Sequence, residues 1–232
     1  MGGTELTERL YCADPYQKEF SARVLEISGN EVVLDKTCFY PEGGGQAGDT
    51  GTIGGVKVAN TIKVGSEILK VGEDEIPIGG KIIHVLESAP AFAVGDVVAC
   101  AIDWEKRHKT MRLHAASHIM EHFLFKVFGN LSRLGSKVDW QKDRGTYGSE
   151  KKFGPEDLKK AEEMTNEFIS RNLEIRTGPS EENPLLRLWQ CEELKMYCGG
   201  THVRNTGEIG KIRMKRSTKG AGKEFVETFL VE

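Results

Sequence analysis

A run without glycine or proline, from Trp104 to Phe128, separates two differently patterned parts of the sequence. Asp103, directly before it, is a favourable N-cap residue, so we expect a long helix to begin here. The preceding part is divided by glycines into short β-rich runs, which is typical of strands joined by turns. We therefore expect a β-rich domain over residues 1–102 and a mixed helix and strand domain over residues 103–232.

The fold class that these patterns favour is α+β. Strands are expected over residues 19–27, 31–34, 81–86 and 97–102, with Gly79 and Gly80 before the third of them. Short strands with glycine-rich turns favour a small barrel or sandwich. A second helix is expected over residues 155–172, because proline and acidic residues suit a helix start. Two further strands are expected over residues 208–215 and 224–231.

Composition limits the class of protein. The chain has 232 residues, of which 38% are hydrophobic and 29% charged, as in ordinary globular proteins. No apolar run approaches the ~20 residues of a membrane span, and the first residues lack the apolar core of a signal peptide. We expect a cytoplasmic protein without a membrane partner. The five cysteines are an odd, scattered set, which favours free thiols or metal ligands over disulfides.

Two short motifs together suggest a metal site. His114 and His118 are four residues apart in the expected helix, so both imidazoles face the same side. Cys198 and His202 are separated by two glycines and a threonine, a segment that can fold back around an ion. Three nitrogens and one sulfur suit tetrahedral zinc. A histidine pair alone is more often an ordinary helix face, and His122 extends the same stripe, but the preferred ligands are these four.

A glycine-rich segment, Thr37 to Gln46, is the other unusual stretch. Gly43, Gly44 and Gly45 would let a ligand approach the backbone closely, and the amide of Gln46 both donates and accepts hydrogen bonds. A tight turn without a ligand explains the glycines equally well. No Gly-Lys-Ser/Thr sequence follows, so the segment is not a P-loop.

Local basic clusters could contact nucleic acid even though the net charge is −3. One lies in the expected last hairpin, where Gly220 and Gly222 would form the turn, and contains Lys211, Arg213, Lys215, Arg216, Lys219 and Lys223. The other lies at the start of the long helix and contains Lys106, Arg107, Lys109 and Arg112. Such clusters suit phosphate contacts, although lysines also protect solvated edge strands.

The motifs carry a resemblance to a known family. FYPEGGGQAGDTG at residues 39–51, HAASH at 114–118 and CGGTH at 198–202 occur in the order and spacing of the alanyl-tRNA synthetase editing region. The sequence more closely resembles the free-standing AlaX trans-editing proteins of medium length. The resemblance implies a small N-terminal β-barrel domain and a C-terminal two-layer α/β domain shared with alanyl- and threonyl-tRNA synthetases.

The resemblance also implies roles for single residues. It implies one zinc ion held by His114, His118, Cys198 and His202, and recognition of a serine hydroxyl by Thr37. Arg133 lies in a segment that matches part of the pocket lining. Two positions depart from the family pattern: Arg133 stands where the synthetases often have glutamine, and Gly145 to Tyr147 stand where relatives often have an aromatic residue and an acid.

The implied activity is trans-editing, the hydrolysis of serine or glycine from mischarged alanine tRNA. In four-coordinate zinc sites the ion is usually structural, so either one ligand yields to water or zinc orients the pocket. Two other functions remain open: a zinc-stabilised RNA-binding module without catalysis, and a zinc hydrolase of small esters.

Overall fold

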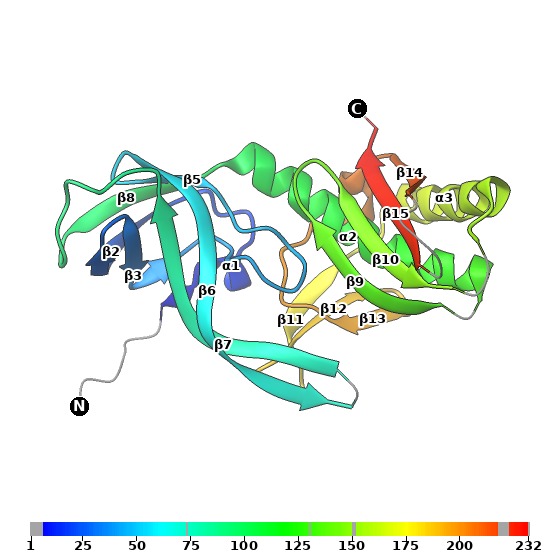
Figure 1. Cartoon of the computed structure of the whole chain (residues 1–232), viewed down its shortest axis with the longest axis horizontal. Coiled ribbons are helices and arrows are strands. Elements are labelled where there is room, and N and C mark those ends of the chain that lie inside the picture. Colours follow the sequence, from blue (N-terminus) through cyan, green and yellow to red (C-terminus); the bar gives the residue numbers. More distant parts are fainter. Residues whose placement is uncertain (1–6, 73, 130, 150–151, 218–222, 232) are drawn as a thin grey trace. The chain divides into compact units, whose positions relative to one another are not determined.

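The computed structural model describes residues 7–231 except residues 73, 130, 150–151 and 218–222. Its contacts divide the chain into two compact units, residues 1–107 and 108–232. Strands predominate over helices in the described part (Figure 1). None of the described helices is both long and apolar enough to cross a membrane.

The first unit consists of short strands and one short helix. The elements are β1 (Glu8–Arg9), α1 (Leu10–Ala13), β2 (Glu19–Ser28), β3 (Glu31–Leu34), β4 (Lys36–Thr37), β5 (Gly51–Ile53), β6 (Val56–Val71), β7 (Asp74–Leu86) and β8 (Val97–Ile102). Six of the strands hydrogen-bond in a closed ring with the order β2-β3-β7-β6-β5-β8. Alternate side chains fill its interior, among them Val24, Leu34, Phe39, Ile53 and Leu86.

The prediction for β7 is wrong at its start. The strand begins at Asp74 and runs through Gly79 and Gly80 instead of starting after them. Both glycines have positive φ, and a Cβ at Gly80 would lie within 3.0 Å of three atoms of β6. The glycines therefore let two closely paired strands bend without ending, and the β6–β7 hairpin extends beyond the ring (Figure 1).

The second unit combines two sheets with long helices. Its elements, with α2 beginning at the end of the first unit, are α2 (Trp104–Phe128), β9 (Ser132–Val138), β10 (Asp143–Gly148), α3 (Pro155–Ser170), β11 (Arg176–Pro179), β12 (Arg187–Cys191), β13 (Leu194–Tyr197), the 3₁₀ helix η1 (Thr206–Ile209), β14 (Ile212–Ser217) and β15 (Lys223–Leu230). One sheet has the order β14-β15-β10-β9 and the other β11-β12-β13.

Both predicted helices are present. Asp103 caps α2 as predicted, because its Oδ1 accepts the backbone N–H of Lys106 at 3.2 Å. Helix α2 is buried on almost all sides between Thr110 and Met120, so it forms the centre of this unit. Helix α3 ends at Ser170, two residues earlier than predicted, and Asn172 has the left-handed φ of 51° that ends helices.

The last two predicted strands differ in accuracy. Strand β15 agrees with the prediction, whereas residues 206–209 form η1 and β14 begins only at Ile212. Gly210, with φ of 71°, separates the two elements. Asn166 of α3 then fixes the start of β14, because its side-chain amide donates to the carbonyl of Ile212 at 2.9 Å and accepts its N–H at 2.8 Å.

Candidate metal centre

Helix α2 supplies half of a buried histidine and cysteine cluster. His114 and His118 lie on the same side of the helix, and their ring centroids are 4.9 Å apart. Ala115 and Ala116 are fully buried between them, so α2 packs closely against its surroundings at this level. Both histidines are themselves buried, which places a polar pair in the interior of the unit.

The segment after β13 supplies the other half. The backbone N–H of Cys198 donates to the carbonyl of Arg187 at 2.8 Å, which fixes the start of this segment. Cys198 Sγ then lies 3.3 Å from His202 Nε2 and 3.5 Å from His114 Nε2. The ligand atoms of His114, His118, Cys198 and His202 all lie within 4.8 Å of one another. The structure thus brings together the four side chains that the sequence suggested as ligands.

The geometry fits a tetrahedral metal ion. Ligand atoms around one zinc ion are roughly 3.5 Å apart, given its usual bond lengths, and the sulfur to nitrogen distances match this value. Both ring nitrogens of His118 and Nδ1 of His202 are buried without a hydrogen-bond partner among the described residues. Because buried polar atoms normally have partners, these nitrogens are consistent with a group that could hold one metal ion.

The protonation states agree with this role. Burial lowers the pKa of His114 to about 3 and holds the pKa of His118 and His202 well below 6.5. The imidazoles are therefore neutral, which is the form that binds metals. Burial raises the pKa of the Cys198 thiol to about 11, so a cation must displace its proton.

The other histidines do not join the cluster. His122, the alternative on the helix stripe, packs its ring against Phe123 with centroids 5.0 Å apart. His108 lies 3.9 Å from Glu208 near the surface. His84 is fully buried inside the first unit.

The glycine-rich segment of the first unit forms a tight turn. The N–H of Gly43 donates to the carbonyl of Gln46 at 3.1 Å, and the N–H of Gln46 donates back at 3.0 Å. Gly44 and Gly45 between them have φ of 60° and 85°, which side chains with a Cβ rarely adopt. The glycines are thus required by the turn itself, and a binding role for Gln46 stays a prediction.

The buried side chain of Arg107 binds residues on both sides of this segment. It is fully buried, and its guanidinium binds both carboxylate oxygens of Asp49, with Nε 3.0 Å from Oδ1. The same group donates to the carbonyl of Cys38 at 2.5 Å and to that of Pro15 at 3.1 Å. The prediction that Arg107 contacts phosphate is therefore wrong, because its charge is used to fix the glycine-rich segment at both ends.

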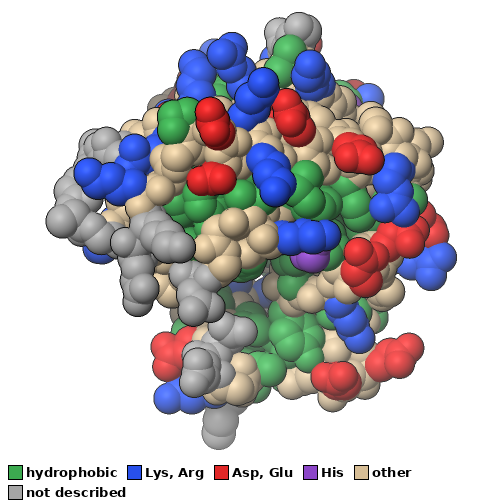
Figure 2. Space-filling view, turned by 90° about the vertical axis from the view of Figure 1, so that its right-hand side faces the viewer, with side chains coloured by type: hydrophobic (Ala, Val, Ile, Leu, Met, Phe, Trp, Pro, Cys, Tyr) green, Lys and Arg blue, Asp and Glu red, His purple; other side chains and the backbone are tan. Residues whose placement is uncertain are grey.

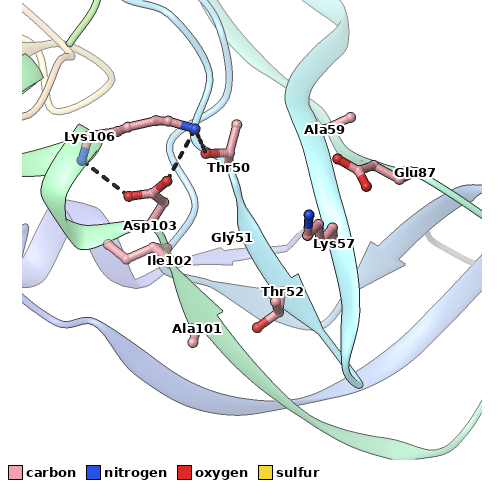
Figure 3. A pocket seen from close by; sticks show the side chains of 10 residues that line it. All are labelled: Thr50, Gly51, Thr52, Lys57, Ala59, Glu87, Ala101, Ile102, Asp103 and Lys106. Carbon is pink, nitrogen blue, oxygen red and sulfur yellow. Dashed lines mark hydrogen bonds and ion pairs between the residues drawn. The ribbon is translucent and has the colours of Figure 1, made fainter.

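A separate open pocket of about 550 Å³ lies on the first unit (Figure 3). Strands β5, β6 and β8 and the start of α2 line it. Lys106 is held over the pocket by Asp103, with Nζ 3.2 Å from Oδ2, and by Thr50 at 3.4 Å. The pocket includes neither the histidine cluster nor the glycine turn.

The predicted basic residues of the last hairpin differ in their exposure and in their ion pairs. Lys211, Arg213 and Lys215 are exposed and alternate along β14 with the buried Ile212 and Met214. Arg216 forms a bidentate ion pair with the buried Glu224, at 2.5 and 2.8 Å, which compensates its charge. Lys219, Gly220 and Gly222 lie outside the described residues.

Strand β10 and the residue directly before it add basic residues that the sequence analysis missed. Lys142 and Arg144 reach Glu227 of β15 at 2.8 and 2.6 Å, and Arg144, Glu227 and Lys215 occupy paired positions across the sheet. A strand over residues 143–148 places alternate side chains on opposite faces of the sheet, and this pattern could have shown that Arg144 is on a sheet surface. Figure 2 shows that one face of the molecule mixes basic with acidic side chains, so its charge is not of a single sign.

Comparison with known proteins identifies the family. Residues 7–106 match the family of tRNA synthetases class II (A), and residues 186–227 match the threonyl and alanyl tRNA synthetase second additional domain. The alanyl-tRNA editing protein AlaX-M of Pyrococcus horikoshii is 38% identical over 97% of this chain and 98% of its own length. The chain belongs to the AlaX-M family. AlaX-M of Saccharolobus solfataricus is 34% identical over 95% of the chain and 98% of its own length.

The synthetases share the same region in a longer protein. The alanine–tRNA ligase of Ignicoccus hospitalis is 34% identical over 92% of this chain, which matches 24% of the ligase. This chain therefore corresponds to a part of the ligase.

Proposed function

We propose that this protein hydrolyses serine, with glycine as a second substrate, from mischarged alanine tRNA. Membership of the AlaX-M family supports the reaction class of an aminoacyl-tRNA deacylase acting in trans. The observation that carries the proposal within this chain is the convergence of His114, His118, Cys198 and His202 on one buried point. Because charged tRNA is the substrate, we place the protein in the cytoplasm.

The metal of this proposal is one zinc ion. Three imidazoles and a thiolate are the donor set that zinc prefers, and a zinc ion would polarise the ester carbonyl or a water molecule as a Lewis acid. The side chain of Trp189 packs beside the cluster, with its ring centroid 5.0 Å from that of His118, and helps to exclude water. Hydrolysis adds water to the carbonyl carbon, breaks the bond to the ribose oxygen and leaves a proton on that oxygen.

Selectivity in this proposal depends on hydrogen bonds to the serine hydroxyl. A site built to pair a hydroxyl rejects alanine, which lacks one, because its own polar groups would stay unpaired. Thr37 is the proposed partner, with Gln46 and the turn of Gly43, Gly44 and Gly45 as neighbours in the first unit. Arg133, paired with Glu121 three residues after His118 on α2, is the proposed contact to the reacting ester.

The proposal assigns the tRNA contact to exposed residues of the second unit. Lys211, Arg213 and Lys215 are the proposed phosphate contacts, and Arg216 contributes less because Glu224 compensates its charge. We further infer that the ring of strands corresponds to the small β-barrel domain of residues 1–102, and that residues 103–232 form the editing domain.

One assay tests the function. The purified protein is incubated with seryl-, glycyl- and alanyl-tRNA for alanine, and the released amino acid is measured. Release of serine with retention of alanine supports editing. Binding of tRNA without any release would instead support an RNA-binding module, and absence of binding would support a hydrolase of small esters.

A further inference from the structure

Arg133 is held in one orientation by Glu121 of α2 and Ser136 of β9. Its Nε lies 3.2 Å from Glu121 Oε1, and its Nη2 donates to Ser136 Oγ at 2.8 Å. The arginine side chain is nevertheless 41% exposed, so the other N–H groups of the guanidinium can reach a ligand. A fixed yet accessible guanidinium is typical of groups that bind anionic oxygens.

Glu121 is the largely buried partner that holds Arg133 in place. Its side chain is only 12% exposed, and it lies three residues after His118 on α2. The phenol of the buried Tyr147 hydrogen-bonds the same carboxylate. Because an ion pair of a largely buried carboxylate is screened little by solvent, Glu121 limits the positions that the Arg133 guanidinium adopts.

Gly145 makes room for this arrangement. A Cβ at Gly145 would lie 2.4 Å from the hydroxyl oxygen of Tyr147 and 2.6 Å from its ring. Any other residue at this position would push the phenol away from its present place. The two positions at which the chain departs from the family pattern, Arg133 and Gly145, are thus connected through Tyr147 and Glu121.

The partner of Arg133 places it near the metal ligands of α2. Glu121, 3.2 Å from the guanidinium, follows His118 by three residues, and side chains three residues apart are neighbours on a helix surface. Arg133 therefore lies beside the helix turn that supplies His118 to the proposed reaction centre.

We propose that Arg133 stabilises the negative charge that develops on the ester carbonyl oxygen, and that Glu121 and Tyr147 are positioning residues that hold it there. The inference rests on the proposed function. When water adds to the carbonyl carbon, the carbon–oxygen double bond opens and its electron pair moves to the oxygen. The guanidinium donates hydrogen bonds to this oxygen until the bond to the ribose oxygen breaks.

Steady-state hydrolysis of seryl-tRNA for alanine tests the role of Arg133. We expect Arg133→Met, which removes every donor, to lower kcat by about 100-fold, the usual effect of losing one oxyanion donor, with KM almost unchanged. Arg133→Lys should restore part of kcat because it restores the charge. Lys137→Gln, which removes an exposed positive charge from the same strand, is the matched control and should leave both constants unchanged.

A double-mutant cycle tests the positioning role. Glu121→Gln alone should lower kcat roughly 10-fold, as expected for a supporting residue, and Tyr147→Phe by less. In the Arg133→Met background, Glu121→Gln should cause no further loss, because Glu121 acts only through the arginine. Metal content of every variant, measured by elemental analysis, should equal that of the wild type.

Three results would overturn the inference while the proposed function stands. The first is an Arg133→Met variant with the activity of the wild type. The second is a rise in KM at constant kcat, which would assign Arg133 to a tRNA phosphate. The third is fully multiplicative losses in the double variant. A wild-type protein that hydrolyses none of the aminoacyl-tRNAs would overturn the proposed function itself, and the role of Arg133 with it.

Discussion

The hydroxyl of Thr37 donates its hydrogen bond to His84 in the interior of the first unit. His84 Nδ1 lies 3.1 Å from the carbonyl oxygen of Val32, so this nitrogen carries the proton, and Nε2 accepts from Thr37 Oγ1 at 2.9 Å. Burial lowers the pKa of His84 to about 4, which keeps the ring neutral. Thr37 also accepts the N–H of Phe39 at 3.0 Å. Its hydroxyl is fully buried and retains one lone pair beyond these two contacts.

Thr37→Val should impair hydrolysis of seryl-tRNA for alanine more than that of the glycyl ester. The variant lacks the hydroxyl, so we expect kcat/KM for serine to fall on the order of tenfold. It also leaves His84 and the N–H of Phe39 unpaired, which should lower the free energy of unfolding by about 1–3 kcal/mol. Thr37→Ser keeps the hydroxyl and should behave as the wild type. Equal losses for serine and glycine, measured below the melting transition, would remove Thr37 from serine recognition.

The metal cluster was predictable because its geometry follows from sequence spacing and ligand chemistry. His114 and His118 lie on the same side of their helix however the helix packs. Cys198 and His202 are the residue types that complete a zinc site, so they could be chosen as the other two ligands. Arg107 was not predictable in the same way. The lysines on either side of it in sequence, Lys106 and Lys109, are partly exposed, and only the long-range contact with Asp49 shows that the charge of Arg107 is buried. Glu121 and Tyr147 gave no local signal either, since their contact depends on the space left at Gly145.

Arg107→Met should destabilise the first unit by about 3–5 kcal/mol, because the substitution leaves Asp49 as a buried, unpaired charge. Asp49 also accepts the backbone N–H of Tyr40 at 2.5 Å, so the glycine-rich segment should loosen. Urea denaturation measures the loss. Lys106→Met, at a partly exposed ion pair, should cost no more than about 1 kcal/mol.

A double variant checks the reason for this loss. If the unpaired carboxylate is the main cost, Arg107→Met combined with Asp49→Asn should be more stable than Arg107→Met alone. Additive losses would show instead that the arginine acts mainly through the carbonyls of Cys38 and Pro15.

Asp143→Asn should stabilise the protein at pH 8 and have little effect near pH 4. Asp143 is 1% exposed, and burial, with the charge of Glu121 adding to it, raises the pKa of its carboxyl from 3.8 to about 8. The folded state therefore holds a proton that the unfolded state loses above pH 3.8. Stability falls as the pH rises from about 4 to 8, by on the order of 3–5 kcal/mol. The asparagine variant should lack this loss.

Denaturation at several pH values between 4 and 8 measures the difference. Thr228→Val changes the residue that is paired with Asp143 on β15, without removing a titratable group, and should keep the wild-type pH dependence. Parallel pH profiles for the wild type and Asp143→Asn would show that Asp143 is ionised in the folded protein.

Zinc binding to the metal-free protein should release about one proton at pH 7. The three imidazoles are already neutral, whereas the Cys198 thiol, whose pKa burial raises to about 11, must lose its proton to bind the ion. The apparent affinity should therefore rise about tenfold per pH unit below this pKa. Calorimetry in two buffers with different ionisation enthalpies gives the number of protons. Cys198→Ala should release none and bind weakly, while Cys191→Ala, a buried thiol outside the cluster, should release the wild-type number. Proton release that persists in Cys198→Ala would show that the sulfur is not a ligand.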